Sequence, residues 1–308
     1  MSRNLLWIVA LASPCVVPAC EALASDAPVR PDVKMERLVL DDGEDASVWY
    51  NGSPEETTVS CGSEHVKQGR FAIKFANVVD HTKGEKNYPV GWPRTGKDLA
   101  KLKRTDWSEY DYFECWIYAK TSRESLPKAP LGIGFYHSGP KQSTHIPLKQ
   151  VRKDAWVKIV IPVAEMAAPE DVQRVQFNIS EADYKHGDQV EFYIDDMALT
   201  RFATAVVAEL VLSRKVLYAN DPVLTAVYRL AGRQPADDLA AEFAIGRGPD
   251  EPAASVQAKA SRQGEVSLTL KRNIAPGMYW ARLGLRDARG QWLDQKTVEL
   301  RVIAGPFE

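Results

Sequence analysis

The chain has 308 residues, of which 45% are hydrophobic and 26% are charged, enough for two globular domains of ordinary size. Its formal net charge of −2 at pH 7 gives it no overall basic field, so we expect neither nucleic acid nor an anionic membrane surface as a partner. The longest basic stretch, residues 97–104, has the spacing of one short exposed helix.

The first 24 residues have the features of a secretory signal peptide. Arg3 precedes an apolar run over 5–17, and Ala22-Leu23-Ala24 is a small-residue cleavage pattern. The run is shorter than the roughly 20 residues that a transmembrane helix needs. We therefore predict a secreted, periplasmic or cell-surface protein without a transmembrane segment. Alternatively, "VPAC" partly resembles a bacterial lipoprotein cleavage box, and Cys20 would then carry a lipid anchor.

Export would leave Cys61 and Cys115 in the mature chain. The two could pair in an oxidising compartment, but the sequence does not fix the distance between them. No C-x-x-C pattern with histidines accompanies them, so the sequence offers no zinc site.

After a polar lead-in over 25–35, apolar residues alternate with polar or small ones through residues 36–201. This period of two is typical of antiparallel strands that bury one face, and short helical stretches are expected only near 96–104 and 163–172. The alternating apolar residues are Phe71, Ile73 and Phe75; Leu131, Ile133 and Phe135; Val157, Ile159 and Ile161; and Val175, Phe177 and Ile179. We predict an all-β domain, a jelly-roll sandwich.

A second set of alternating runs occupies residues 203–308. The tetrad Asp-Ala-Arg-Gly at 287–290 separates two of these runs and predicts a hairpin. About seven short strands in about 105 residues fit a smaller immunoglobulin-like sandwich. We expect this domain to act as a spacer or to contact a protein partner, because no polar cluster in it converges by spacing.

Acidic residues gather near both ends of the first domain. Asp42 and Glu44 flank Gly43 after its first strand, and Asp195 and Asp196 stand side by side in its last, "EFYIDDMAL". If the first and last strands pair, the two groups meet, and clustered carboxylates without histidine or thiolate suit calcium. Alternatively, "DDGED" is a solvated acidic turn, and one of the adjacent aspartates must point outward.

Several motifs resemble, in their order, the calcium-bearing β-jelly-roll carbohydrate-binding modules with a galactose-binding-like fold. They are "LVLDDGEDASVW", "VKQGRFAIKF", "DWSEYDYFECWIYA", "AWVKIVIPV", "VQRVQFNI" and "EFYIDDMAL". The resemblance covers residues 36–201. It implies a structural calcium held by Glu44 and Asp195, with Asp42 and Asp196 next, and by backbone carbonyls beside "GRF".

Sugars are recognised by exposed aromatic rings flanked by hydrogen-bonding groups. Trp107, Trp116 and Trp156 lie in strand-like or packing contexts, so we expect them to be structural. Three loop or hairpin stretches combine aromatic and polar residues, and such positions often carry binding residues. The carbohydrate-binding candidates are Trp49 and Tyr50; Tyr88, Trp92 and Arg94; and Tyr136, His137 and Gln142.

The sequence has no G-x-S-x-G, H-E-x-x-H, phosphate-binding or dinucleotide-binding motif, so we name no catalytic residue. A lyase arrangement of Tyr136, His137, Lys141 and Arg94 remains an alternative. Our prediction is an exported, non-catalytic protein that binds a polysaccharide or oligosaccharide and uses a structural calcium. The alternatives are a polysaccharide lyase or glycoside hydrolase acting through the same face, and a surface-assembly protein that makes only protein contacts.

Overall fold

The computed structural model describes most of the chain from residue 33 onward. The described ranges are 33–83, 91–139, 143–221, 223–233, 239–248, 252–270 and 274–305. The predicted signal peptide and the alternative lipid site at Cys20 lie outside the described residues. Within those ranges, no helix has the length and apolar character needed to cross a membrane.

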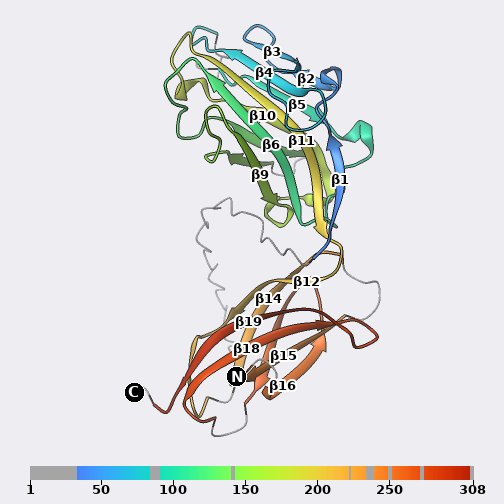
Figure 1. Cartoon of the computed structure of the whole chain (residues 1–308), viewed down its shortest axis with the longest axis vertical. Helices are drawn as coiled ribbons and strands as arrows, with labels where there is room; N and C mark the ends of the chain where they lie inside the picture. The colour runs from blue at the N-terminus through green and yellow to red at the C-terminus, as the bar shows by residue number, and fades with distance from the viewer. Residues whose placement is uncertain are drawn as a thin grey trace, which may run out of the picture.

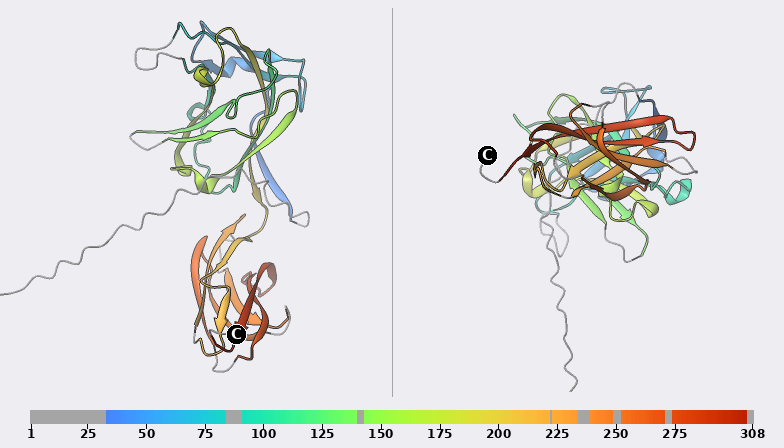
Figure 2. Two further views of the ribbon diagram at one scale, coloured as in Figure 1. Left: turned by 90° about the vertical axis from the view of Figure 1, so that its left-hand side faces the viewer. Right: turned by 90° about the horizontal axis from the view of Figure 1, so that it is seen from below.

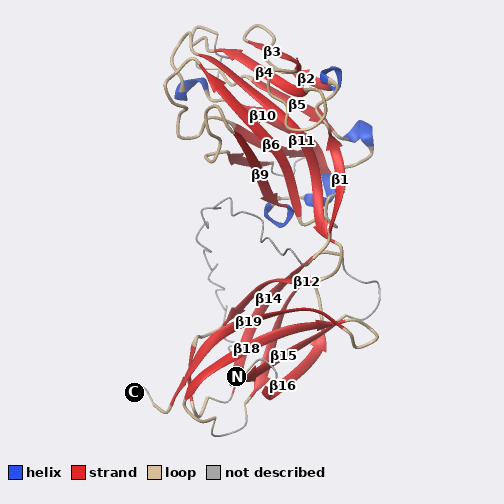
Figure 3. Cartoon of the chain, in the orientation of Figure 1, coloured by secondary structure: helices blue, strands red, loops and turns tan. Residues whose placement is uncertain are grey.

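The protein is all-β, as predicted, and its strands form two successive sandwiches (Figures 1 and 3). The first sandwich pairs a sheet of order β3-β4-β11-β6-β9, with β1 also on β11, against a sheet of order β2-β5-β10-β7-β8. Its strands are β1 Met35–Asp41, β2 Trp49–Asn51, β3 Thr57–Gly62, β4 Ala72–Val78, β5 Arg94–Asp98, β6 Tyr112–Thr121, β7 Gly132–His137, β8 Thr144–Pro147, β9 Trp156–Pro162, β10 Val172–Asn178 and β11 Gln189–Phe202. Short 3-10 turns lie at η1 Ala46–Val48, η2 Ala100–Leu102, η3 Val163–Glu165, η4 Pro169–Asp171 and η5 Glu181–Asp183.

Aromatic side chains fill the core between these two sheets. Trp107 is fully buried, stacks on Phe113 at 5.6 Å between ring centroids, and meets Phe135 edge to face. Its predicted structural role is confirmed. Trp49 is also a core residue, because its ring stacks against Phe177 and its indole N–H donates to Asp41 Oδ2 at 3.0 Å.

The predicted exposed helix at 97–104 is wrong. Arg94–Asp98 is strand β5, and only Ala100–Leu102 forms a 3-10 turn. Lys97 is buried and forms an ion pair with Asp41, which is buried as well. The basic spacing was misleading because one of its lysines neutralises a carboxylate inside the sandwich, where a buried charge needs a partner.

The second sandwich consists of a three-stranded sheet, β12-β14-β17, and a five-stranded sheet, β13-β19-β18-β15-β16. Its strands are β12 Val206–Leu212, β13 Val216–Tyr218, β14 Val223–Ala231, β15 Ala240–Gly246, β16 Pro252–Lys259, β17 Gln263–Thr269, β18 Gly277–Arg286 and β19 Trp292–Ile303. The hairpin predicted at 287–290 joins β18 to β19, and Gly290 there has a φ of 76°.

The two sandwiches follow one another along the molecule (Figure 2), and a small buried cluster joins them where β11 leads into β12. Tyr112, Phe202, Val206 and Ala231 contribute to it. Beside it, the Asp111 carboxylate accepts backbone N–H groups of Phe202 and Gly232, both at 2.9 Å from Oδ2. The joint therefore includes hydrogen bonds as well as apolar contact.

The two cysteines among the described residues are both free thiols. Cys115 is completely buried in β6, whereas Cys61 is exposed at the end of β3. The disulfide that the sequence left open is not formed in this structure.

Candidate functional site

The adjacent aspartates of β11 lie where this strand changes its neighbour. β11 pairs with β4 up to Ile194 and with β1 from Met197, and its register on β6 shifts between Asp195 and Ala198. Asp196 adopts a φ of 54°, which lets successive carboxylates take different environments. Asp195 is buried, whereas Asp196 pairs with Arg37 at 2.5 Å near the surface.

The predicted meeting of the two acidic groups occurs at the loop between β3 and β4. Asp195 Oδ2 accepts the backbone N–H groups of Lys67 and Gln68 at 2.8 and 3.0 Å. Glu44 Oε1 accepts those of Arg70 and Phe71 at 2.5 and 3.1 Å. Asp195 and Glu44, which are distant in the sequence, thus both accept hydrogen bonds from the loop between β3 and β4.

One oxygen atom at this position is a candidate ligand for a cation. Asp195 Oδ1 is buried and has no hydrogen-bond partner. A Cβ placed on Gly43 would come within 3.1 Å of this oxygen and 3.0 Å of the Phe71 carbonyl oxygen, so both border the same small space. Carboxylate and carbonyl oxygens are calcium ligands. Burial raises the pKa of the Asp195 carboxyl, whereas the N–H groups of Arg70 and Phe71 hold the pKa of Glu44 below its usual range.

The other two predicted ligands are placed differently. Asp42 is exposed, and its carboxylate accepts the Glu44 N–H at 3.3 Å, while Asp196 is engaged by Arg37. Across the described part of the chain, no group of three or more histidine, cysteine or acidic side chains forms a metal-binding cluster. A calcium here would depend on Asp195, Glu44 and backbone carbonyls.

The second candidate site is the outer face of the sheet β2-β5-β10-β7-β8, which we call the open face. Strand register aligns Tyr50, Gly96, Gln176, Gly134 and His145 in one row across it. The Tyr50 hydroxyl donates to Gln176 Oε1 at 2.5 Å, and Gln176 Nε2 donates to the Tyr136 hydroxyl at 2.9 Å. The glutamine therefore holds two phenol rings on the same surface.

Glycines keep the floor of the open face low. A Cβ on Gly134 would come within 3.0 Å of both Tyr136 Cε2 and His145 Nδ1, and one on Gly96 would come within 3.0 Å of Tyr50 Cε1. The aromatic side chains therefore lean over positions that have no side chain. The Tyr136 and His145 rings meet edge to face, with 5.2 Å between their centroids, and both stand on the open face.

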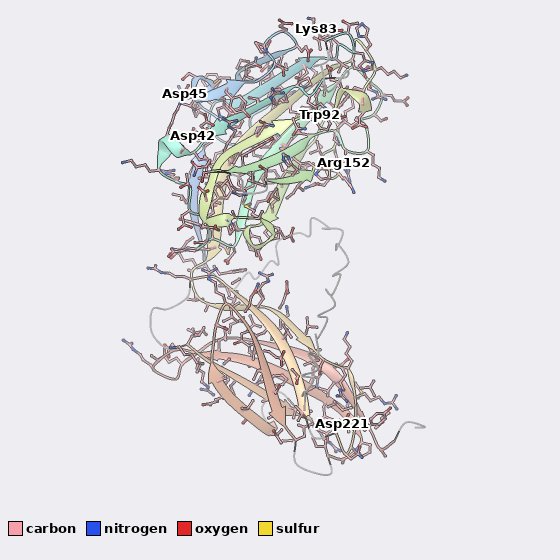
Figure 4. The ribbon with its side chains drawn as sticks, turned by 180° about the vertical axis from the view of Figure 1, so that it is seen from behind. Asp42, Asp45, Lys83, Trp92, Arg152 and Asp221 are labelled. Carbon is pink, nitrogen blue, oxygen red and sulfur yellow. The ribbon has the colours of Figure 1, made fainter. Side chains whose placement is uncertain are left out.

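A hollow of about 340 Å³ lies at one end of this row. Its lining includes Trp92, Gly132, His145, Pro147 and Asn178. Trp92 is 45% exposed, and Figure 4 labels it on the first sandwich, away from Asp42 and Asp45. The volume falls within the range of about 300 to 1,000 Å³ that is usual for small-ligand sites.

Charged groups stand beside the tyrosines. Arg174 pairs with Asp98 at 2.7 Å and lies over the Tyr50 ring, 4.9 Å from its centroid. Burial raises the pKa of Tyr50 to about 12, so its phenol remains a hydrogen-bond donor at neutral pH. The open face thus combines aromatic surface with hydrogen-bond donors and acceptors.

The structure brings together only part of the predicted sugar-binding set. Tyr50, Trp92, Arg94 and Tyr136 lie on the open face or its rim. Trp49 does not, because it belongs to the core. His137 Nδ1 instead faces the Asp171 carbonyl at 3.1 Å, and its Nε2 is buried. The predicted residues that fall outside the described ranges are Tyr88 and Gln142, together with Lys141 of the lyase alternative.

Sequence reasoning missed the contribution of strand β10. Arg174, Gln176 and Asn178 alternate with the buried Val175 and Phe177, so all three lie on the open face. The alternation in "VQRVQFNIS" was the available signal, since its polar positions share one side of the sheet.

Comparison with known proteins gives no family assignment: no family model matches the sequence, and no curated protein matches it. Among solved structures, the chain is similar to the CBM22-1 and GH10 modules of Clostridium thermocellum endo-1,4-β-D-xylanase 10B, complexed with xylohexaose (13% identity, 59% of this chain, 30% of that chain, TM-score 0.33). It is also similar to the CBM22 tandem domain of Paenibacillus barcinonensis Xyn10C (10% identity, 88% of this chain, 86% of that chain, TM-score 0.30). A third similar structure is the C-terminal family 22 carbohydrate-binding module of the Clostridium thermocellum enzyme (12% identity, 52% of this chain, 89% of that chain, TM-score 0.28).

The chain spans only 20% to 49% of the length of five other matched structures, including a family 76 glycoside hydrolase from a Bacteroides thetaiotaomicron strain. At TM-scores of 0.24 to 0.33, these likenesses are too distant to assign a ligand to this chain.

Proposed function

We propose that the first sandwich binds a polysaccharide or oligosaccharide on its open face. The observation that carries this proposal is the row in which Gln176 links the hydroxyl groups of Tyr50 and Tyr136 beside the hollow at Trp92. Pyranose rings offer flat C–H faces and a rim of hydroxyl groups. Exposed aromatic rings next to amide and charged side chains match both features.

The test is affinity electrophoresis of the mature chain through a panel of neutral and acidic polysaccharides. We expect retardation by at least one of them, and Trp92→Ala should reduce it, since an exposed aromatic that stacks on ligand typically contributes more than about 1 kcal/mol. Trp156→Ala, on the opposite sheet, is the matched control and should leave retardation unchanged. Loss of retardation in both variants, or in neither, would contradict this placement.

Incubating the chain with the same polysaccharides tests whether it is an enzyme. Binding alone leaves the polysaccharide length unchanged, whereas a hydrolase releases reducing ends and a lyase releases unsaturated ends. Tyr136 and His137 occupy successive positions of β7 and so point to opposite faces of the sheet. This separation favours binding over a lyase mechanism that needs both groups on one substrate. We further propose that residues 1–24 direct export of the chain, consistent with an extracellular glycan as ligand.

We also propose that calcium stabilises the loop between β3 and β4. Asp195 Oδ1 and the Phe71 carbonyl would contribute ligands, and Glu44 would complete the acidic side of the site. The ion would neutralise a buried carboxylate whose Oδ2 accepts two neutral backbone N–H groups and whose Oδ1 has no hydrogen-bond partner. The melting temperature should rise with calcium and fall with a chelator in the parent chain, and Asp195→Ala should abolish the difference. An equal calcium response in Asp195→Ala would contradict the site.

A further inference from the structure

The second sandwich carries an aromatic surface of its own, on the outer face of the sheet β13-β19-β18-β15-β16. Trp280 of β18 is 36% exposed and Trp292 of β19 is 43% exposed. The positions Trp280, Arg282, Gly284 and Arg286 alternate with the buried Ala281, Leu283 and Leu285, so they share the outer side. Trp292 pairs with Arg286 across the hairpin. We call this surface the two-tryptophan face.

The centre of the two-tryptophan face is flat. Register places Gly246 next to Trp280, Ala244 next to Arg282, and Glu242 next to Gly284. A Cβ on Gly284 would come within 2.1 Å of Trp292 Cζ3, so the indole ring lies directly against this glycine. The small residues Gly246, Ala244 and Gly284 thus leave space beside both indoles.

Polar groups converge between the two indoles, which the spacing of the sequence did not reveal. Glu242 lies 3.5 Å from Arg282 and 3.4 Å from Arg286, and it accepts the Gln257 amide at 3.2 Å. The Arg286 guanidinium lies 3.6 Å from the centroid of the Trp292 ring. Two guanidinium groups therefore share one carboxylate beside the aromatic surface.

The charge of this face is positive. Strand register places on it the cationic side chains of Arg282, Arg286, Arg301 and Lys259, and the acidic side chains of Glu242 and Glu299. Four cationic groups stand against two carboxylates, although the whole chain carries a net charge of −2. An acidic ligand matches this local excess.

The other outer face of the second sandwich provides a contrast. On the sheet β12-β14-β17, the large exposed apolar side chains are Val211, Val223 and Val227, and β14 lies between the other two strands. Aliphatic side chains of this kind offer no ring for stacking. Within the described strands of this sandwich, exposed indole rings stand beside guanidinium groups on the two-tryptophan face and not on the valine-bearing face.

We propose that the two-tryptophan face binds a polysaccharide that carries carboxylates, as a second site separate from the open face. The indoles stack on sugar rings, and Arg282 and Arg286 hydrogen-bond to the carboxylate and hydroxyl groups between them. This site would give the second sandwich a binding role beyond that of a spacer, and a polymer could then engage both domains of one chain.

The experiment measures binding of the full mature chain to polygalacturonate by affinity electrophoresis and titration calorimetry. Each measurement uses the Trp92→Ala background, which lowers the contribution of the open face, and every further variant is compared with this background. We expect Trp280→Ala combined with Trp292→Ala to weaken binding by about tenfold or more. Arg282→Gln should lower the affinity less and reduce its dependence on salt, because it removes one charge from the interaction.

Val227→Ala, on the valine face of the same sandwich, is the matched control and should bind as the background does. Circular dichroism and thermal melting identify any variant that fails to fold, and Trp280→Phe with Trp292→Phe, which keeps aromatic rings, should then retain most of the affinity. The proposal is overturned if the Trp92→Ala background does not bind polygalacturonate. It is also overturned if the double alanine variant folds and binds as tightly as the background.

Discussion

The two outer faces of the first sandwich have the same alternation of residues but different surroundings. On the sheet β3-β4-β11-β6-β9, His65 from the β3–β4 loop stacks on Tyr118 at 3.9 Å between centroids, and Tyr193 is left 1% exposed. Lys67 from the same loop lies 3.8 Å over the Trp116 ring. We call this the covered face. On the open face, by contrast, Trp92 stands 45% exposed beside a hollow.

The difference shows that aromatic residues at outward positions do not by themselves define a binding site. Tyr118 and Tyr193 pair across β6 and β11, just as aromatic residues face the open side of the other sheet, but the chain's own loop occupies their surface. Asp195 and Glu44 fasten this loop by four backbone hydrogen bonds. In the described ranges no loop is held over the open face in this way, so we expect the ligand there.

Removing the Asp195 carboxylate, which holds the β3–β4 loop over the covered face, is expected to have the largest effect, and that effect is on stability. Asp195→Ala removes a buried carboxylate that accepts the part-buried N–H groups of Lys67 and Gln68, and the loss of these two charge-assisted hydrogen bonds should cost about 2–4 kcal/mol of unfolding free energy. Urea denaturation measures this loss. Asp196→Asn, which alters an ion pair near the surface, should cost less than about 1 kcal/mol. Equal losses of unfolding free energy in the two variants would contradict the different roles assigned to the buried Asp195 and the outward-facing Asp196.

Removing a ring from the open face should have the next largest effect, on affinity and not on folding. Tyr136→Ala deletes one of the two phenols held by Gln176 and should weaken glycan binding by about 1–2 kcal/mol. Titration calorimetry measures this loss with the polysaccharide that retards the parent chain. Tyr118→Ala on the covered face is the control, and the comparison fails if it weakens binding by as much.

Adding a methyl group at Gly134, on the open face, should produce a smaller loss of glycan affinity. A methyl group at Gly134 would press on the Tyr136 and His145 side chains, which can shift, and not on backbone atoms. We expect Gly134→Ala to lower glycan affinity by less than about 1 kcal/mol while the melting temperature changes little. A large drop in the melting temperature without a change in affinity would show that the glycine serves packing alone.

The covered face should also respond to acid through Glu44. Its folded-state pKa is lowered by the N–H groups of Arg70 and Phe71, so its contribution to stability is present above the unfolded pKa and lost as the pH falls through the folded one. Asp195 opposes this trend because burial raises its pKa. Glu44→Gln, measured with a chelator present, should therefore flatten the acid limb of the stability profile. An unchanged limb would contradict the role of Glu44.

The sequence predicted the parts of this account that depend on local pattern. Alternation located most strands, and the distribution of acidic residues predicted the meeting of Glu44 and Asp195 at one loop. The sequence could not show that Lys97 neutralises Asp41, because the two residues meet only when the sheet that contains β5 packs against the sheet that contains β1. Nor could it separate Trp49 from Trp92, since burial of a tryptophan depends on the sheet that packs against it.

A crystal structure of the protein with an oligosaccharide from the polysaccharide that it binds would show which face of the first sandwich holds the ligand. The crystals should be grown from the Trp280→Ala and Trp292→Ala double variant, which lacks both indoles of the two-tryptophan face. We expect sugar rings against Trp92 and Tyr136, with hydroxyl groups bonded to Gln176 or Asn178. An oligosaccharide seated against Trp116 and Tyr118, with the β3–β4 loop displaced, would contradict this expectation.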